Sequence, residues 1–222
     1  MAMTSNATPQ FNFKGRRSPL TLTITILVVL SGILLSLSGF YADWLWFKSV
    51  AFTSVWTTVL TTKIFLFVIA GLLTSSIILL NIIIAYKRRP LYVPLSIEAD
   101  NLERYRAQIE PIKRWVVLAL AVGLFYFAGT SGSALWESWL LFKNSTSFGV
   151  KDPQFNMDIS FFAFKLPFYQ TLIAWAISTL VLAIIAAAVV HYLYGGIRLQ
   201  VQEDRTTVAA RVQLSVLLGG VV

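Results

Sequence analysis

Four long apolar segments constrain this chain more than any other feature of its sequence. They lie at residues 20–41, 64–86, 115–136 and 168–194. A helix needs about 20 mostly apolar residues to cross a hydrocarbon core about 30 Å thick, because each residue adds about 1.5 Å. No Asp, Glu, Lys or Arg lies near the middle of any segment. We therefore expect an all-α fold, an integral membrane helical bundle with four complete transmembrane helices.

Composition supports this fold class and narrows the chemistry. Of the 222 residues, 57% are hydrophobic and only 13% are charged, whereas soluble domains average about 45–50% and about 25%. The absence of cysteine excludes disulfide frameworks and thiolate zinc sites, and a single histidine excludes bis-histidine haem within the chain. The sequence offers no catalytic residue set and no metal-ligand cluster. We therefore expect no enzymatic activity.

The distribution of Lys and Arg predicts how the chain is threaded. The N-terminal tail, the second connection between segments and the residues after the fourth segment carry 13 of them, and the other two connections carry 5. Cytoplasmic connections are enriched in Lys and Arg, so the N-terminus is predicted to be cytoplasmic. The net charge of +8 then reflects topology and attraction to anionic lipid headgroups. We expect membrane lipids as partners and no nucleic acid.

This threading divides the chain into three parts. Residues 1–19 form a cytoplasmic tail and residues 20–194 form the four-helix transmembrane region. Residues 195–222 form a cytoplasmic segment and the start of a fifth apolar segment near Val212, which the chain ends before completing. We expect this fifth helix to be truncated, as in a fragment of a longer protein or a subunit completed by a partner.

Two connections contain patterns that predict short helices. Residues 43–62, which include Trp44, Trp46 and Phe47, fit either a helix lying in the outer interface or an outer extension of the second segment. On the cytoplasmic side, Asp100 has the spacing of a helix cap, with Glu103 three residues later. Interfacial helices in the connections are therefore part of the expected fold.

The connection at residues 137–167 is long and rich in phenylalanine, which predicts an ordered re-entrant or lid-like element. Asp152, Asn156 and Asp158 could supply oxygen ligands, but their spacing is not that of an EF-hand, and turn and cap roles are favoured. The aromatic and acidic residues of the outer connections are the candidate interface residues, namely Trp44, Trp46, Phe47, Asp152, Phe155, Asp158, Phe161 and Phe164.

His191 is the one candidate cofactor ligand. It lies near the cytoplasmic end of the fourth segment, where it could bind a cofactor or pigment together with Asn81. Alternatively it is a satisfied residue at a helix C-terminus, where the helix dipole favours a cation. Hydroxyl and amide groups within the segments, such as Thr74, Ser75 and Ser178, fit hydrogen bonds within and between helices. No cofactor is predicted from these residues.

Several motifs resemble a known bacterial family. The most specific reads Phe148-Gly149-x-x-Asp152-Pro153-x-Phe155-x-x-Asp158-Ile159-Ser160-Phe161, followed by Phe164-x-Leu166-Pro167-Phe168. Others are Trp46-Phe47-x-Ser49-Val50-x-Phe52, Val55-Trp56-x-Thr58, Ala85-Tyr86 with Arg89-Pro90, and His191 with Gly195-Gly196-x-Arg198. Together they resemble the N-terminal region of uncharacterised protein family 0182 (UPF 0182). The resemblance implies a large multi-pass protein of actinobacteria or cyanobacteria, with further spans and a large extracytoplasmic domain, and no established activity.

The expected function is a structural or scaffold role, in which the chain is an accessory subunit that associates with other integral membrane proteins. The alternative is the membrane part of a transporter or exporter of a lipid or envelope component, whose large extracytoplasmic domain lies elsewhere. The expected location is the bacterial plasma membrane, or the thylakoid membrane if the source is a cyanobacterium.

Overall fold

The computed structural model describes residues 19–90, 97–198 and 205–222. The chain divides into two units, residues 1–57 and 58–222, and each is described by itself. Within the described ranges the regular structure is helical, with two isolated backbone bridges and no strand. Four of the helices are long and apolar enough to cross a membrane. The all-α membrane helical bundle is confirmed.

The first unit contains α1 (Pro19–Ser49) and the beginning of α2 (Thr53–Lys87). The chain turns between them at Ala51, whose φ is 62°. Within this unit the rings of Phe40 and Trp56 pack with their centroids 5.0 Å apart. Residues 43–62 therefore form no separate interfacial helix: their first part extends α1, and their second part extends α2, as one alternative predicted.

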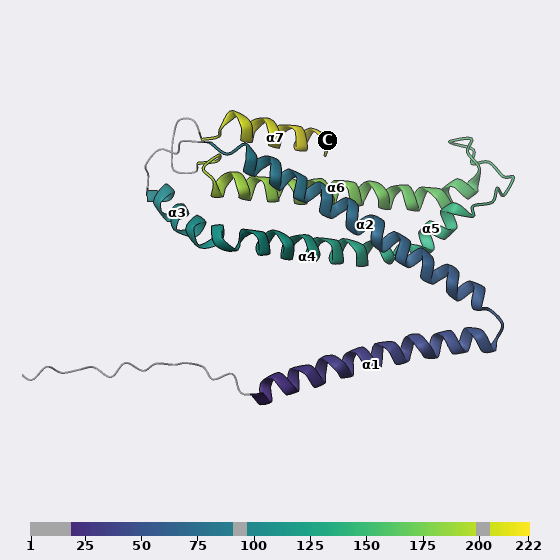
Figure 1. Cartoon of the computed structure of the whole chain (residues 1–222). Helices are drawn as coiled ribbons and strands as arrows, with labels where there is room; N and C mark the ends of the chain where they lie inside the picture. The colour runs from purple at the N-terminus through teal and green to yellow at the C-terminus, as the bar shows by residue number, and fades with distance from the viewer. Residues whose placement is uncertain (1–18, 91–96, 199–204) are drawn as a thin grey trace, which may run out of the picture. The chain divides into compact units, whose positions relative to one another are not determined.

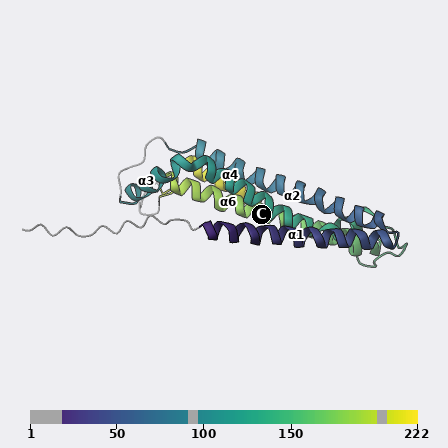
Figure 2. The ribbon, with the colours of Figure 1, turned by 60° about the horizontal axis from the view of Figure 1, so that its bottom comes forward.

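The second unit is built around α2, α4 (Lys113–Ser133) and α6 (Leu166–Leu193); the axes of α4 and α6 are roughly aligned, and α2 crosses them at an angle (Figure 1; Figure 2 shows a rotated view). Glycines bring α2 and α4 together. A Cβ placed on Gly71 would lie 2.8 Å from the Phe125 carbonyl oxygen, and one on Gly132 would lie 2.9 Å from the Leu66 carbonyl oxygen. Because Cβ atoms essentially never lie this close to a backbone oxygen, these positions depend on the absence of a side chain.

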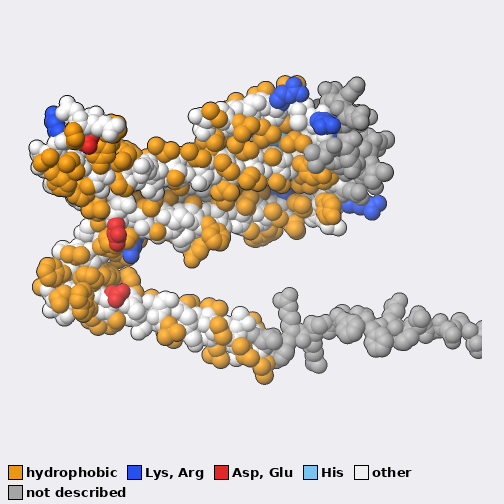
Figure 3. Space-filling view, turned by 180° about the vertical axis from the view of Figure 1, so that it is seen from behind, with side chains coloured by type: hydrophobic (Ala, Val, Ile, Leu, Met, Phe, Trp, Pro, Cys, Tyr) orange, Lys and Arg blue, Asp and Glu red, His pale blue; other side chains and the backbone are white. Residues whose placement is uncertain are grey.

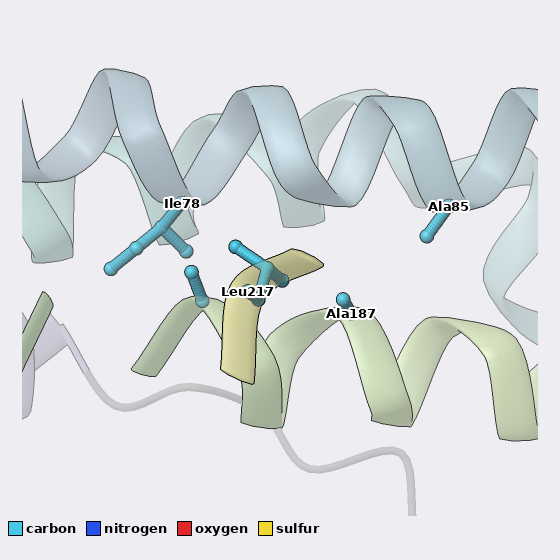
Figure 4. Packing of buried hydrophobic residues seen from close by; sticks show 5 residues of the cluster. Ile78, Ala85, Ala187 and Leu217 are labelled. Carbon is cyan, nitrogen blue, oxygen red and sulfur yellow. The ribbon is translucent and has the colours of Figure 1, made fainter. Parts of the chain in front are cut away.

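The buried core joins α2 and α6 to α7 (Val208–Gly219). Ile78 and Ala85 of α2 pack with Ala187 of α6 and Leu217 of α7, as the close-up shows (Figure 4). Backbone contacts on either side of residues 199–204 join the end of α6 to the start of α7: Gly195 takes a φ of 75°, and the Thr207 N–H donates to the Gly196 carbonyl at 2.8 Å.

Shorter elements lie in the two long connections of this unit. They are α3 (Ile97–Ile109) with the 3-10 turn η1 (Glu110–Ile112), and α5 (Trp136–Lys143) with the π-helical turn η2 (Phe161–Lys165). The proposed cap at Asp100 is wrong, because α3 begins three residues earlier, at Ile97, and Asp100 lies inside the helix.

The helices lie where the apolar segments predicted them, but several begin or end at residues other than the predicted ones. α1 and α2 extend beyond residues 20–41 and 64–86, and α4 ends at Ser133, three residues before the predicted boundary. The predicted tail at residues 1–19 lies outside the described residues, apart from Pro19. The fifth apolar segment forms a helix from Val208, and its role as the start of a fifth span stays a prediction.

Candidate functional site

Three polar side chains form a hydrogen-bonded chain across the buried core of the second unit. His191 of α6 places Nε2 3.0 Å from Oε1 of Gln213 in α7. The Gln213 side-chain amide donates to the Asn81 backbone carbonyl at 2.9 Å and to Asn81 Oδ1 at 3.2 Å. Asn81 in turn donates from Nδ2 to the Ile77 carbonyl of α2 at 2.9 Å. One polar chain therefore connects three helices.

The direction of these hydrogen bonds fixes the tautomer of His191. The Gln213 amide nitrogen already donates to Asn81, so Oε1 is the acceptor and His191 Nε2 carries the hydrogen. His191 is 1% exposed and Gln213 is 7% exposed. Because water is excluded, each of these bonds is electrostatically stronger than it would be in solvent, and an unpaired member would be unfavourable.

The second ring nitrogen of His191 faces backbone. Nδ1 is buried and has no hydrogen-bond partner among the residues that the structure describes. A Cβ placed on Gly196 would lie 2.8 Å from Nδ1, so the connection after α6 covers this nitrogen. A cofactor metal needs an imidazole lone pair with open space before it. Neither nitrogen of His191 offers one, so the geometry fits packing rather than cofactor binding.

Other polar groups within the helices are also engaged. The Trp175 indole N–H of α6 donates to Thr74 Oγ1 of α2 at 3.1 Å. The hydroxyls of Ser75 and Ser178 donate to carbonyls four residues earlier, at 2.6 and 2.8 Å. The expectation that these groups bond within and between helices is confirmed at these positions.

Asp158 organises the connection that follows α5. Its carboxylate accepts hydrogen bonds from the backbone N–H groups of Phe148 at 3.1 Å, Gly149 at 3.0 Å and Ser160 at 2.8 Å, and from the Ser147 hydroxyl. These bonds, led by that of Ser147, hold the pKa of Asp158 well below its usual range. Gly149 has a φ of 73°, a conformation that favours glycine.

The second carboxylate of this connection has a similar local role. Asp152 Oδ2 accepts the backbone N–H groups of Gln154 at 3.0 Å and Phe155 at 2.8 Å. The Asp152 N–H also donates to the Met157 carbonyl at 2.8 Å, and Asn156 adopts a φ of 53°. The turn and cap roles predicted for the acidic residues are confirmed.

Aromatic contacts hold the same connection against α6 and its π-helical turn. Ring centroids are 5.4 Å apart for Phe148 and Phe164, and 5.9 Å apart for Phe155 and Phe162. Phe161 lies 6.4 Å from Tyr169 of α6. The connection is ordered, as expected, while its role as an interface stays a prediction.

The remaining interface candidates lie at the end of α1. Trp44 stacks on Tyr41 with centroids 5.8 Å apart, and Lys48 Nζ lies 4.9 Å from the Trp44 centroid. Trp46 contacts Phe47 edge to face at 4.9 Å and is 59% exposed. These residues form two aromatic pairs within the first unit, Tyr41 with Trp44 and Trp46 with Phe47.

Sequence reasoning missed Gln213, the central member of the polar chain. One signal was available, because Gln213 is an amide within an otherwise apolar run. Its partners could not be read from the sequence, since Asn81 lies 132 positions away.

Comparison with known proteins identifies the family. Residues 20–222 match the family described as "Uncharacterised protein family (UPF0182)". The UPF0182 protein of Streptomyces coelicolor is 44% identical over 200 residues, which cover 90% of this chain and 20% of that protein. The UPF0182 protein of Nocardioides sp. is 44% identical over 207 residues, covering 92% and 21%. That of Frankia alni is 46% identical over 177 residues, covering 80% and 17%.

No solved structure is significantly similar to the chain. The chain spans about a fifth of the length of the Streptomyces and Nocardioides relatives. The match across residues 20–222 shows that the chain belongs to the uncharacterised family UPF0182.

Proposed function

We propose that this region is a membrane-embedded structural scaffold that associates with other integral membrane proteins. The observation that carries the proposal is the buried polar chain of Asn81, His191 and Gln213, whose hydrogen bonds join helices to one another. Around the bundle, hydrophobic side chains cover the visible flanks, with Lys and Arg near its ends (Figure 3). Apolar flanks of this kind suit contact with lipid or with other transmembrane helices.

The proposal includes no enzymatic activity for this region. General acid–base and nucleophilic chemistry need positioned groups with free reactive atoms. Within the described ranges, no three His, Cys, Asp or Glu residues come together in a group suited to a metal ion. The carboxylates of Asp152 and Asp158 accept backbone hydrogen bonds, which supports a structural role for them.

We further propose that the protein resides in a bacterial plasma membrane with a cytoplasmic N-terminus. The 13 to 5 division of Lys and Arg between alternate sides supports this orientation. The similar proteins of Streptomyces, Nocardioides and Frankia support a bacterial setting.

The first unit supplies the surface best suited to a partner. Within the first unit, the most apolar part of α1 has no buried residue. At the end of this helix the exposed Trp46 lies beside Phe47. Exposed tryptophan is the residue type that most often dominates the binding energy of a protein interface. We therefore place the partner contact on α1.

The transporter alternative gains no comparable support. A permeation path would need polar groups that are free to contact a solute. The hydroxyls of Ser75 and Ser178 instead donate to carbonyls of their own helices.

The test is the native mass of the full-length protein after solubilisation in a mild detergent, with identification of any integral membrane protein present in a fixed ratio. We expect such a complex, and we expect Trp46→Ala to weaken it about thirtyfold, since interface hot spots contribute about 2 kcal/mol. Trp115→Ala is the matched control, because Trp115 is an exposed tryptophan of α4 outside the proposed contact. A monomer carrying only lipid and detergent contradicts the proposal.

A further inference from the structure

At the α3 end of the second unit, the rings of two tyrosines contact the guanidinium groups of two arginines. Tyr86 near the end of α2 meets Tyr194 after α6, with centroids 5.1 Å apart and planes at 89°. Arg89 Cζ lies 4.4 Å from the Tyr86 centroid and 5.4 Å from that of Tyr194. Arg106 of α3 places Cζ 5.6 Å from the Tyr194 centroid. Cation–π contacts thus hold both guanidinium groups at the same ring.

Arg106 is incompletely satisfied in this position. Its Nε donates to the carbonyl of Leu193, the last residue of α6, at 2.5 Å. Its Nη2 is buried and has no hydrogen-bond partner among the described residues. A guanidinium cannot lose its proton in a protein, so a buried N–H group without an acceptor is unfavourable. A hydrogen-bond acceptor from outside the described residues would therefore stabilise Nη2 of Arg106.

The local charge balance also favours an anion. Glu110 supplies a carboxylate at this end, and Lys113 pairs with it while also donating to the Tyr86 hydroxyl at 3.3 Å. Among the described residues, neither Arg89 nor Arg106 forms an ion pair with a carboxylate, although the charge of Arg89 also acts on Glu110. Two guanidinium groups beside one ring repel each other, and an anion between them would offset that repulsion.

We propose that Arg89 and Arg106 bind the phosphate group of an anionic membrane lipid. Guanidinium donors match phosphate oxygens in a planar, two-bond geometry. The site lies where α2 and α6 end, which is the level at which tyrosines and lipid headgroups meet in a membrane. Exposed Ile83 on α2 and Val189 on α6 precede it on the same helices and offer an apolar surface to the acyl chains. This apolar surface favours a lipid over free phosphate.

The test is native mass spectrometry of the full-length protein in detergent, titrated with phosphatidylglycerol, phosphatidylcholine or inorganic phosphate. We expect Arg89→Gln to weaken phosphatidylglycerol binding about tenfold, the effect of losing one charge-assisted hydrogen bond. Arg88→Gln is the matched control, because it removes the same charge from the neighbouring exposed position. It should change binding by less than about twofold, as expected of a screened surface charge.

Arg106→Lys is a second variant for the same binding measurement. It retains the charge but removes the planar donor group, so it should also weaken phosphatidylglycerol binding. A thermal melt of each variant checks folding, and the exposed position of Arg89 keeps the test valid if Arg106 variants unfold.

Three results would overturn the proposal. They are equal weakening by Arg88→Gln and Arg89→Gln, equal affinity for phosphatidylcholine, or inorganic phosphate binding as tightly as phosphatidylglycerol. The first would indicate general electrostatic attraction, and the last would identify free phosphate as the ligand. The site depends on membrane embedding but not on a protein partner, so its failure would leave the scaffold proposal standing.

Discussion

At the residue scale, Gln213 connects more of the fold than any other polar side chain described above. Its amide accepts from His191 and donates to Asn81, so α6, α7 and α2 meet through one group. His191 and Asn81 could both be singled out from the sequence, because each is a polar residue in an apolar segment. The hydrogen-bonded link between His191 and Asn81 could not be predicted from the sequence, because it depends on the turn after Gly195 that returns α7 alongside α6.

Replacing Gln213 with leucine is expected to lower the free energy of unfolding by about 1–3 kcal/mol, because it leaves buried polar groups of His191 and Asn81 without partners. Denaturant or thermal unfolding of the full-length protein in detergent measures the change. Ser215→Ala, at an exposed position of the same helix, should leave stability within about 0.5 kcal/mol. Equal stability of the two variants would show that the polar chain contributes nothing.

Asp158→Asn is expected to loosen the connection after α5. At neutral pH, hydrogen exchange of the Phe148, Gly149 and Ser160 amides should become faster than in the wild type, because the carboxylate that accepts them is lost. Glu137→Gln, which removes a charge from an exposed position of α5, should leave these amides protected. Unchanged exchange in Asp158→Asn would contradict the organising role of this carboxylate.

The pH dependence of this effect follows from the lowered pKa of Asp158. A carboxyl whose pKa is lower in the folded state stabilises that state above its unfolded pKa of about 3.9. The stabilisation is lost as the pH falls through the folded value. The difference in protection between wild type and Asp158→Asn should therefore persist through mildly acidic pH and disappear only below the usual range of an aspartate.

At the element scale, helix positions were predictable and helix contacts were not. The apolar segments located α1, α2, α4 and α6 because length and lack of charge are visible in the sequence. The turn at Ala51 could not be predicted, since no glycine or proline lies at that position. Small residues also differ in their packing: Ala183 and Ala187 of α6 are fully buried, whereas Gly123 of α4 has open space where a Cβ would be. Spacing shows that a close approach is possible but not which face of a helix makes it.

Two glycines of α4 therefore make a matched pair. Gly132→Ala is expected to destabilise the bundle by about 1–3 kcal/mol, because the new Cβ would collide with the backbone and side chain of α2 at Leu66 and Ala70. Gly123→Ala should be neutral or stabilising by up to about 1 kcal/mol, since alanine favours helix. Unfolding in detergent measures both, and a parallel change in the two variants would contradict the close packing of α2 and α4.

At the scale of the whole molecule, the fold class followed from composition, while the activity does not follow from the fold. Four apolar helices indicate a membrane protein, and the buried hydrogen bond between His191 and Gln213 is part of the basis for the structural role proposed above. The family match relates this chain to much longer proteins: it spans about a fifth of the length of the Streptomyces and Nocardioides relatives. The scaffold proposal therefore concerns the residues of this chain alone.

The most direct test of the account is the threading of the chain, because every proposal above depends on it. This region has no cysteine, so single cysteines can report on it in the full-length protein after any cysteine elsewhere is replaced. Thr146→Cys, after α5, should react with a membrane-impermeant maleimide in intact cells. Gln108→Cys, in α3, should react only after the membrane is opened. Val181→Cys, within α6, should resist the reagent in both conditions. Labelling of Thr146→Cys and Gln108→Cys from the same side, or ready labelling of Val181→Cys, would contradict a bundle that spans the membrane as described.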